Sequence, residues 1–463
     1  MTGLARSTER PEWIIGPRGD LCWISGSLGL AFLAIAAYHL LQIGGSLSAE
    51  LAVGALYLAW TLIFDGTHFF ATYSRTFGDP SFRRSRGALL YGSMIVFAIG
   101  PAAIAAAYAQ GGTEAARAAS IVFNRVALTW AYLHLCRQHW GLITLYGRKA
   151  GDMLPSVRRL EAALVACGFA APYAVLLARS TAPLSLAETF FVSQPIWDQL
   201  AARLAMIGSA GLLLALVALS SGQSARAKGL TRTAGWAGAL LLALAACTTA
   251  TSWSGLGTAL ERLGFVSGGA AIGLGVAALG WEYARRGRVN VGKWALMLAA
   301  LGTHNAVLLW DGLPIALQLI ALTLAHNVQY HRIVWLHNVA HARGSAGPVD
   351  GSDAESTAPP EPPRLSRMRV YLTWALAFSA LYGVLRLPVV WIEGRELLLY
   401  AYVAFAWGVP MHHYVLDGVI WRPSRSRALR VRLGLDPGSG GAASTEANMS
   451  LTSRPARSPA VRV

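Results

Sequence analysis

The sequence contains few charged residues, and most of those are basic. Only 13% of its 463 residues are charged, and lysine and arginine outnumber aspartate and glutamate by 39 to 23. Hydrophobic residues make up 54% of the chain. A typical soluble domain carries about 25% charged residues. This composition therefore excludes an ordinary soluble domain and predicts an integral membrane protein.

Cysteine is also scarce. The four cysteines, Cys22, Cys136, Cys167 and Cys247, stand alone in four different hydrophobic runs. A disulfide framework or a thiolate metal site needs cysteines in paired or clustered positions. The sequence predicts neither.

The hydrophobic runs are continuous and rich in alanine, leucine and glycine, so they favour helices over the alternating strands of a membrane barrel. Runs of about 18 to 25 residues predict about twelve membrane-spanning helices, and hence an all-α polytopic bundle. The predicted spans are 21–43, 50–71, 88–108, 118–147, 159–178, 198–219, 233–251, 265–283, 294–312, 314–337, 367–388 and 397–421.

The basic residues lie in alternate predicted loops, within 75–86, 148–159, 226–232, 285–293 and 422–432. By the positive-inside rule, both termini are predicted to be cytoplasmic. Topology thus accounts for the net charge of +16, and no nucleic-acid partner is predicted. The first hydrophobic run is long enough to anchor the chain, so we expect a multi-pass protein of the cell inner (plasma) membrane.

Composition divides the chain into four parts. Residues 1–341 are predicted to form a transmembrane body of about ten helices. Residues 342–366, rich in Gly, Ser and Pro, are predicted to be a flexible cytoplasmic linker. Residues 367–421 should form a C-terminal transmembrane hairpin, and residues 422–463 a disordered, basic cytoplasmic tail.

Histidine is concentrated where other polar residues are rare. The stretch 324–341 reads LAHNVQYHRIVWLHNVAH and places His326, His331, His337 and His341 on one apolar helix. Each imidazole buried in a membrane helix needs a polar partner. Ten of the eleven histidines lie on predicted spans that run toward the cytoplasm or on the ninth span, and nearly all of them map to the cytoplasmic half of the predicted bundle. His39, near the outer end of the first span, is the exception, and we expect it to be structural.

The other predicted spans contribute further histidines. His134 and His139 are five residues apart, about 140° around a helix, so they cannot bind one ion without distortion. His304 can face His326 across a helical hairpin. The remaining candidates stand beside carboxylates: Asp65 and His68 at i,i+3, and His412 and His413 with Asp417.

Imidazoles with few carboxylates suit iron, copper or zinc, and so many ligands are too many for one ion. The pattern predicts two transition-metal ions, with iron expected and zinc or copper as alternatives. The predicted ligands or their neighbours are His68, His134, His139, His304, His326, His331, His337, His341, His412, His413, Asp65 and Asp417.

Several of these motifs resemble those of the membrane histidine-box di-iron enzymes, the fatty acid desaturase, hydroxylase and alkane monooxygenase group. The spacings His134-x4-His139 and His326-x4-His331 look like the first box of that group. The spacing His337-x3-His341 is similar, and the His412–His413 pair resembles the end of the last box.

The resemblance implies oxidation by dioxygen of a lipid or other lipophilic substrate, with electrons from an external donor. It places the protein in lipid metabolism. It also implies that the histidines are ligands and that the two aspartates bind or orient them. The outer groups that it suggests are Arg137, Gln138, Tyr330 and Tyr414.

Two other classes of protein stay open at this stage. A proton- or metal-coupled transporter also uses intramembrane histidine and aspartate in about twelve helices. A haem-binding electron-transfer protein would use two or four histidines from facing helices. The sequence does not distinguish the substrate, the metal or the redox partner.

Overall fold

The computed structural model describes residues 12–151, 154–179, 256–310, 312–342, 367–386, 395–423 and 426–435. Within these ranges every regular element is helical, which confirms the all-α class. The longer elements are α2 (Leu30–Leu40), α3 (Ala49–Trp60), α4 (Gly66–Thr76), α5 (Pro80–Gly92), α6 (Val96–Lys149), α7 (Pro155–Arg179), α11 (Leu256–Arg286), α12 (Val291–Leu308), α13 (Ile315–Ala342), α14 (Met368–Arg386), α15 (Glu396–Ala406) and α16 (Gly408–Ile420). The shorter elements are α1 (Pro17–Asp20), α17 (Arg427–Arg432), the π-helical turns η1 (Leu21–Ser25) and η4 (Thr61–Asp65), and the 3-10 turns η2 (Gly26–Gly29), η3 (Ile43–Gly45) and η5 (Ser93–Ile95).

Five helical stretches in the described part of the chain are long and apolar enough to cross a membrane. They are Pro17–Leu40, Ala49–Thr76, Phe82–Lys149, Pro155–Leu176 and Met368–Leu385. The predicted spans 198–219 and 233–251 lie outside the described residues. The count of twelve spans and the cytoplasmic placement of the termini therefore stay predictions.

Two predicted spans, 88–108 and 118–147, meet at a sharp break inside α6. Gly111 and Gly112 leave the helical conformation, and Gly112 has a φ of 66°, in the left-handed region that glycine tolerates best. The two arms then pack on each other, because a Cβ at Gly100 would lie only 2.6 Å from the ring of Phe123. The element is thus a hairpin of two helical arms, as the hydrophobic pattern predicts.

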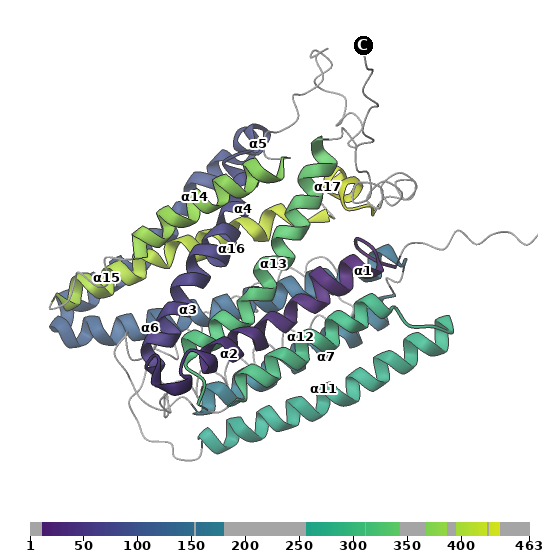
Figure 1. Cartoon of the computed structure of the whole chain (residues 1–463), viewed down its shortest axis with the longest axis horizontal. Helices are drawn as coiled ribbons and strands as arrows, with labels where there is room; N and C mark the ends of the chain where they lie inside the picture. The colour runs from purple at the N-terminus through teal and green to yellow at the C-terminus, as the bar shows by residue number, and fades with distance from the viewer. Residues whose placement is uncertain are drawn as a thin grey trace, which may run out of the picture.

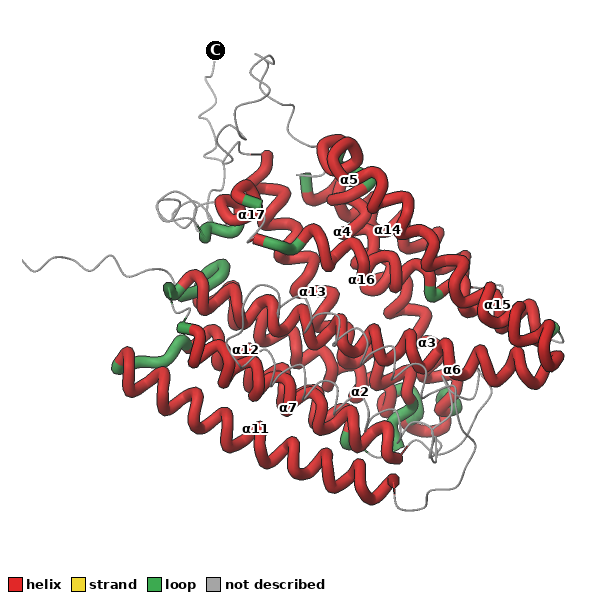
Figure 2. Tube along the Cα trace, turned by 180° about the vertical axis from the view of Figure 1, so that it is seen from behind, coloured by secondary structure: helices red, strands yellow, loops and turns green. Residues whose placement is uncertain are grey.

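The helix α13 lies at the centre of the bundle (Figures 1 and 2). In both views α2, α12 and α7 lie on one side of it, with α11 outermost, and α4, α14 and α16 lie on the other. The helix with the densest run of histidines is therefore the one that most others can reach.

A π-helical turn interrupts the second span just before His68. The wider turn η4 carries the chain from α3 into α4, and Ser379 of α14 donates from Oγ to the carbonyl oxygen of Thr61, at 3.1 Å. Gly66 allows this close approach, because a Cβ there would lie 2.8 Å from the Cα of Ser379. π-helical turns are rare and are frequent at functional sites.

The C-terminal hairpin is part of the same bundle rather than a separate unit. α14 packs against α4, α15 against α6, and α16 against both α4 and α6. A buried hydrogen bond of 2.8 Å from Trp407 Nε1 to Asn124 Oδ1 joins the hairpin to α6. The linker predicted at 342–366 separates the hairpin from the body in sequence only; its residues from 343 onward lie outside the described residues.

Part of the tail predicted to be disordered is helical. Ser426 begins α17 by accepting from the backbone N–H of Leu429, and the Leu429 side chain is buried. A cap and a buried apolar side chain are enough to stabilise this short turn against the body of the protein. Residues 436–463 lie outside the described residues.

A buried ionic cluster ties α12 to α7 and α11. The ammonium of Lys293 lies 2.5 Å from Glu161 Oε1 and 2.7 Å from Glu282 Oε2. Burial alone would lower the pKa of Lys293, but the two carboxylates outweigh it and the pKa is raised. Lys293 is thus charged and paired, and the cluster serves helix packing.

Candidate metal centre

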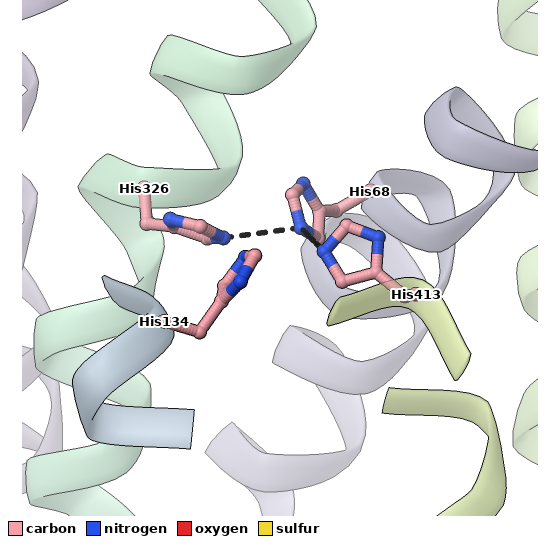
Figure 3. A group of neighbouring side chains, drawn as sticks. All are labelled: His68, His134, His326 and His413. Atoms are coloured by element: carbon pink, nitrogen blue, oxygen red, sulfur yellow. Dashed lines mark hydrogen bonds between the residues drawn. The ribbon is translucent and has the colours of Figure 1, made fainter. Parts of the chain in front are cut away.

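Four histidines from four helices converge at one position. They are His68 of α4, His134 of α6, His326 of α13 and His413 of α16. One ring nitrogen of each lies within 4.8 Å of those of the other three. Figure 3 shows the four rings pointing toward one another from four separate segments of the chain. We refer to these four residues as the four-histidine group.

The spacing of the nitrogens fits the ligands of a single ion. His68 Nε2 lies 2.9 Å from His413 Nε2 and 3.1 Å from His326 Nε2 (dashed in Figure 3). Imidazole nitrogens bind zinc, for example, at about 2.0–2.1 Å, so two ligands at the tetrahedral angle are about 3.3 Å apart. A neutral imidazole has one N–H and one lone pair, so three converging nitrogens cannot all satisfy one another. A cation would satisfy every lone pair at once.

The group is almost closed to solvent. His68 and His326 are 2% and 4% exposed, and His413 is fully buried. The side chain of His134 keeps 13% of its surface. Burying polar rings this deeply costs free energy unless their nitrogen atoms are hydrogen-bonded or bind an ion. The group is therefore a buried set of neutral donors with one more accessible member.

A hydrogen-bond network fixes the outer side of His413. Thr72 Oγ1 lies 2.7 Å from His413 Nδ1 and donates to Asp417 Oδ1 at 2.8 Å. Because its only proton goes to the carboxylate, the hydroxyl accepts from Nδ1–H, and His413 Nε2 keeps its lone pair toward the group. Tyr330 also donates to Asp417 Oδ1, at 2.6 Å, and accepts from Trp421 Nε1 at 3.0 Å.

The second carboxylate oxygen of Asp417 faces the four-histidine group. Its Oδ2 lies 3.5 Å from His413 Nε2 and 3.7 Å from His134 Nε2. The network holds Oδ1 and leaves Oδ2 as an oxygen donor beside the four imidazoles. Asp417 thus lies where the sequence places a ligand or an orienting carboxylate.

The four residues that the resemblance suggests as neighbours of the ligands lie in different places around the four-histidine group. Gln138 donates to the carbonyl oxygen of His326 at 2.9 Å, which joins α6 to α13. The ring of Tyr414 stacks on His134 with centroids 4.3 Å apart. Tyr330 contacts His68 edge to face at 4.4 Å. Arg137 is exposed on α6, one turn beyond His134.

Two of the predicted ligands bind protein groups instead. His331 contacts Thr67 Oγ1 through Nε2 at 3.0 Å and Tyr371 OH through Nδ1 at 2.9 Å. His412 contacts Ser93 Oγ through Nε2 at 3.0 Å and Tyr73 OH through Nδ1 at 3.3 Å. His331 follows His326 by five residues, and His412 precedes His413 by one. Each therefore lies on a helix face turned away from its neighbour in the four-histidine group.

His304 does not face His326, contrary to the expectation from the sequence. Its ring lies 5.4 Å from that of His139, and both are fully buried beside Phe169. His139 points away from His134 on α6, as the 140° between them predicts. The reason for the difference is that α7 packs against α12, which brings Phe169 to His304.

Two other predicted residues, Asp65 and His337, are also separate from the group. Asp65 is buried and accepts from Tyr382 OH at 3.3 Å. His337 lies beside Asn338 and Trp421, with ring centroids 6.4 Å apart for the last pair. The backbone of His341 belongs to α13, and its side chain lies outside what the structure describes. His39 is exposed beside Trp310 and is not a member of the group.

Two members of the group, His134 and His326, lie well inside their helices rather than at the ends. His134 precedes the end of α6 by fifteen residues, about 22 Å of helix, and His326 follows the start of α13 by eleven, about 16 Å. The sequence predicts instead that these residues lie near helix ends, at the cytoplasmic boundary of the membrane.

Some members of the site had no recognisable signal in the sequence. Thr72 and Trp421 complete the hydrogen-bond network of His413 and Asp417, yet threonine and tryptophan are ordinary residues of apolar helices. Only a small polar residue four positions after His68, on the same helix face, could have suggested Thr72.

Comparisons with protein-family models, curated proteins and solved structures found no match to this chain.

Proposed function

We propose that the protein is a membrane-embedded metalloenzyme. In this proposal the four-histidine group binds one transition-metal ion, in the first place iron, and the enzyme oxidises a lipophilic substrate with dioxygen. The observation that carries the proposal is the convergence of four ring nitrogens within 4.8 Å. Imidazole donors suit iron, copper and zinc, and of these iron and copper are redox-active.

The geometry supports one ion rather than two. Among the described residues, the four-histidine group is the one set of three or more possible ligands that lie close enough together to hold a metal ion. His139 and His304 form a separate pair, and His331 and His412 are bonded to hydroxyl groups. His68, His134, His326 and His413 would hold the ion, with Asp417 Oδ2 as a fifth donor.

A redox-active ion in this position would supply the site at which dioxygen is activated. The chain itself keeps the donors neutral and correctly oriented, and it limits water, because three of the four ligands are almost fully buried. An external electron donor would supply the electrons that hydroxylation or desaturation requires. A haem is a poor fit, since its macrocycle already occupies four positions around the iron and leaves room for two axial ligands.

The test is elemental analysis of the detergent-purified protein together with its optical spectrum. We expect about one iron per chain and no haem absorbance. His413→Ala should lose most of the metal without loss of expression. His412→Ala is the matched control, because this neighbour on α16 lies outside the four-histidine group and should keep the metal.

Folded protein that binds no transition metal would refute the proposal. Metal that exchanges freely, in protein that consumes no dioxygen with any lipophilic substrate, would favour a metal-coupled transporter instead.

A further inference from the structure

The side chain of Tyr330, on α13, connects the four-histidine group to the end of α16. Its ring meets that of His68 edge to face, with centroids 4.4 Å apart, and lies 5.8 Å from the ring of His413. The ring of Trp421 also meets Tyr330 edge to face, at 5.7 Å. Aromatic pairs in direct contact have centroids about 4.5–7 Å apart. His68, Tyr330 and Trp421 therefore form an unbroken series of ring contacts.

Trp421 brings this series to the outside of the bundle. It directly follows the last residue of α16, and its side chain is half-buried, whereas Tyr330 is buried. The guanidinium of Arg75 lies over the indole, 4.5 Å from the ring centroid. One ring, that of Tyr330, thus separates a half-buried indole from a proposed ligand of the metal.

The four-histidine group itself is too enclosed for an external electron donor to touch. His68, His326 and His413 are almost fully buried. His134 is the most accessible member, and Tyr414 covers one face of its ring. Electrons from a donor outside the bundle therefore need groups of the chain between the surface and the metal.

The hydroxyl of Tyr330 has the hydrogen bonds that a redox-active phenol needs. It donates to Asp417 Oδ1 at 2.6 Å, and Trp421 donates from Nε1 to the phenolic oxygen at 3.0 Å. A phenol that loses an electron becomes a strong acid, so it is oxidised readily where a hydrogen-bonded acceptor takes its proton in the same step. A carboxylate oxygen is such an acceptor, and the indole N–H stabilises the phenolic oxygen that remains.

We propose that Tyr330 is a redox-active residue that passes electrons, one at a time, from Trp421 to the four-histidine group. The inference rests on the proposed function and names the path of the electrons from the external donor. In the first step Tyr330 loses one electron to the oxidised iron centre and its phenolic proton to Asp417 Oδ1, which leaves a neutral tyrosyl radical. In the second step an electron from the donor crosses Trp421 to this radical, and Asp417 returns the proton. Each cycle moves one electron inward and leaves the three residues unchanged.

The test is electron paramagnetic resonance of the full-length, detergent-purified protein, reduced with dithionite and frozen directly after mixing with dioxygen in the absence of substrate. We expect the spectrum of a tyrosyl radical, which should narrow in protein that contains ring-deuterated tyrosine. Tyr330→Phe should lose this signal and keep its iron, because Asp417 still accepts from Thr72. Tyr371→Phe is the matched control and should keep the signal, since the hydroxyl of this buried tyrosine contacts His331, outside the four-histidine group.

Replacement of Trp421 tests the outer half of the path. Trp421→Phe should form the radical as wild type does, because Tyr330 and Asp417 remain. When ferrocyanide is added as the external donor, the radical should decay more slowly than in wild type, because phenylalanine is not redox-active and has no N–H for the phenolic oxygen. Trp374→Phe, at an exposed tryptophan of α14, should decay as wild type.

Two results would overturn the inference: an undiminished tyrosyl signal in Tyr330→Phe, or equal rates of decay in Trp421→Phe and wild type. Iron content and dioxygen consumption are measured on every sample. Should Tyr330→Phe lose iron, the decay rate in Trp421→Phe decides the question. Protein that holds iron and consumes dioxygen but forms no tyrosyl radical would refute the electron path while the proposed function stands. Folded protein without metal would refute both.

Discussion

Replacement of Thr72 by valine tests the link between the hydrogen-bond network and the metal. Valine keeps the shape of threonine and removes the hydroxyl, which lies 2.7 Å from His413 Nδ1 and 2.8 Å from Asp417 Oδ1. Asp417 keeps the hydrogen bond from Tyr330. His413 is fully buried, so its Nδ1–H is left without an acceptor. An unsatisfied buried donor costs about 1–3 kcal/mol.

The same loss should weaken metal binding. With the hydroxyl gone, nothing holds the proton of His413 on Nδ1, and the tautomer with the proton on Nε2 blocks the nitrogen that faces the group. Loss of the partner that orients a ligating histidine costs about 10–100-fold in metal affinity. This factor corresponds to about 1.4–2.8 kcal/mol, which matches the cost of one unsatisfied donor.

The assay is competition for iron with a chelator of known affinity, on detergent-purified protein. Thr67→Val is the matched control, because the same change on the same helix removes a hydroxyl that contacts His331, outside the four-histidine group. Thr72→Ser, which restores the hydroxyl, should recover most of the affinity. Equal affinities in Thr72→Val and wild type, or an equal loss in Thr67→Val, would show that the network does not support the metal.

Two further predictions concern residues near the group. His139→Leu should keep the metal and should not lower the melting temperature. Neither ring nitrogen of His139 has a hydrogen-bond partner among the described residues, so an apolar replacement removes the cost of burying them unsatisfied. His134→Leu should lose the metal, and similar metal contents in the two variants would contradict the assignment of His134 as a ligand. Gly66→Ala should cost about 1–3 kcal/mol and lower metal content, since the new Cβ would meet Ser379 and push α4 from α14. Gly54→Ala, where the space around the Cβ is open, is its control, and thermal melting with metal analysis compares the two.

The sequence predicts the helical class and most of the described helix positions, because each depends on local hydrophobic length. The break at Gly111 and Gly112 falls between two predicted spans, and the predicted span 159–178 lies within α7. The packing of α14 to α16 into the body could not be predicted in this way. It depends on contacts such as Trp407 with Asn124, which are 283 residues apart.

The candidate site could be predicted as a type of chemistry but not as a list of ligands. Histidine density on α13 indicates a metal site, yet His326, His331 and His337 are equivalent in sequence terms. Their roles differ because α4, α6 and α16 approach α13 at His326, whereas Thr67 and Tyr371 reach His331 first.

The orientation of His68 shows most clearly why local sequence was insufficient. A π-helical turn adds one residue to the helix just before it, which rotates everything after the turn by about 100° relative to a regular helix. Without η4, His68 would point away from His326 and His413, to which it is now joined at 3.1 and 2.9 Å. Residues 61–65 read TLIFD, which has nothing to distinguish it from regular helix. The turn persists because Ser379, more than 300 residues later, bonds to the carbonyl oxygen of Thr61. The ligand set on α4 therefore depends on the docking of α14, and the four-histidine group can form only when the C-terminal hairpin is in place.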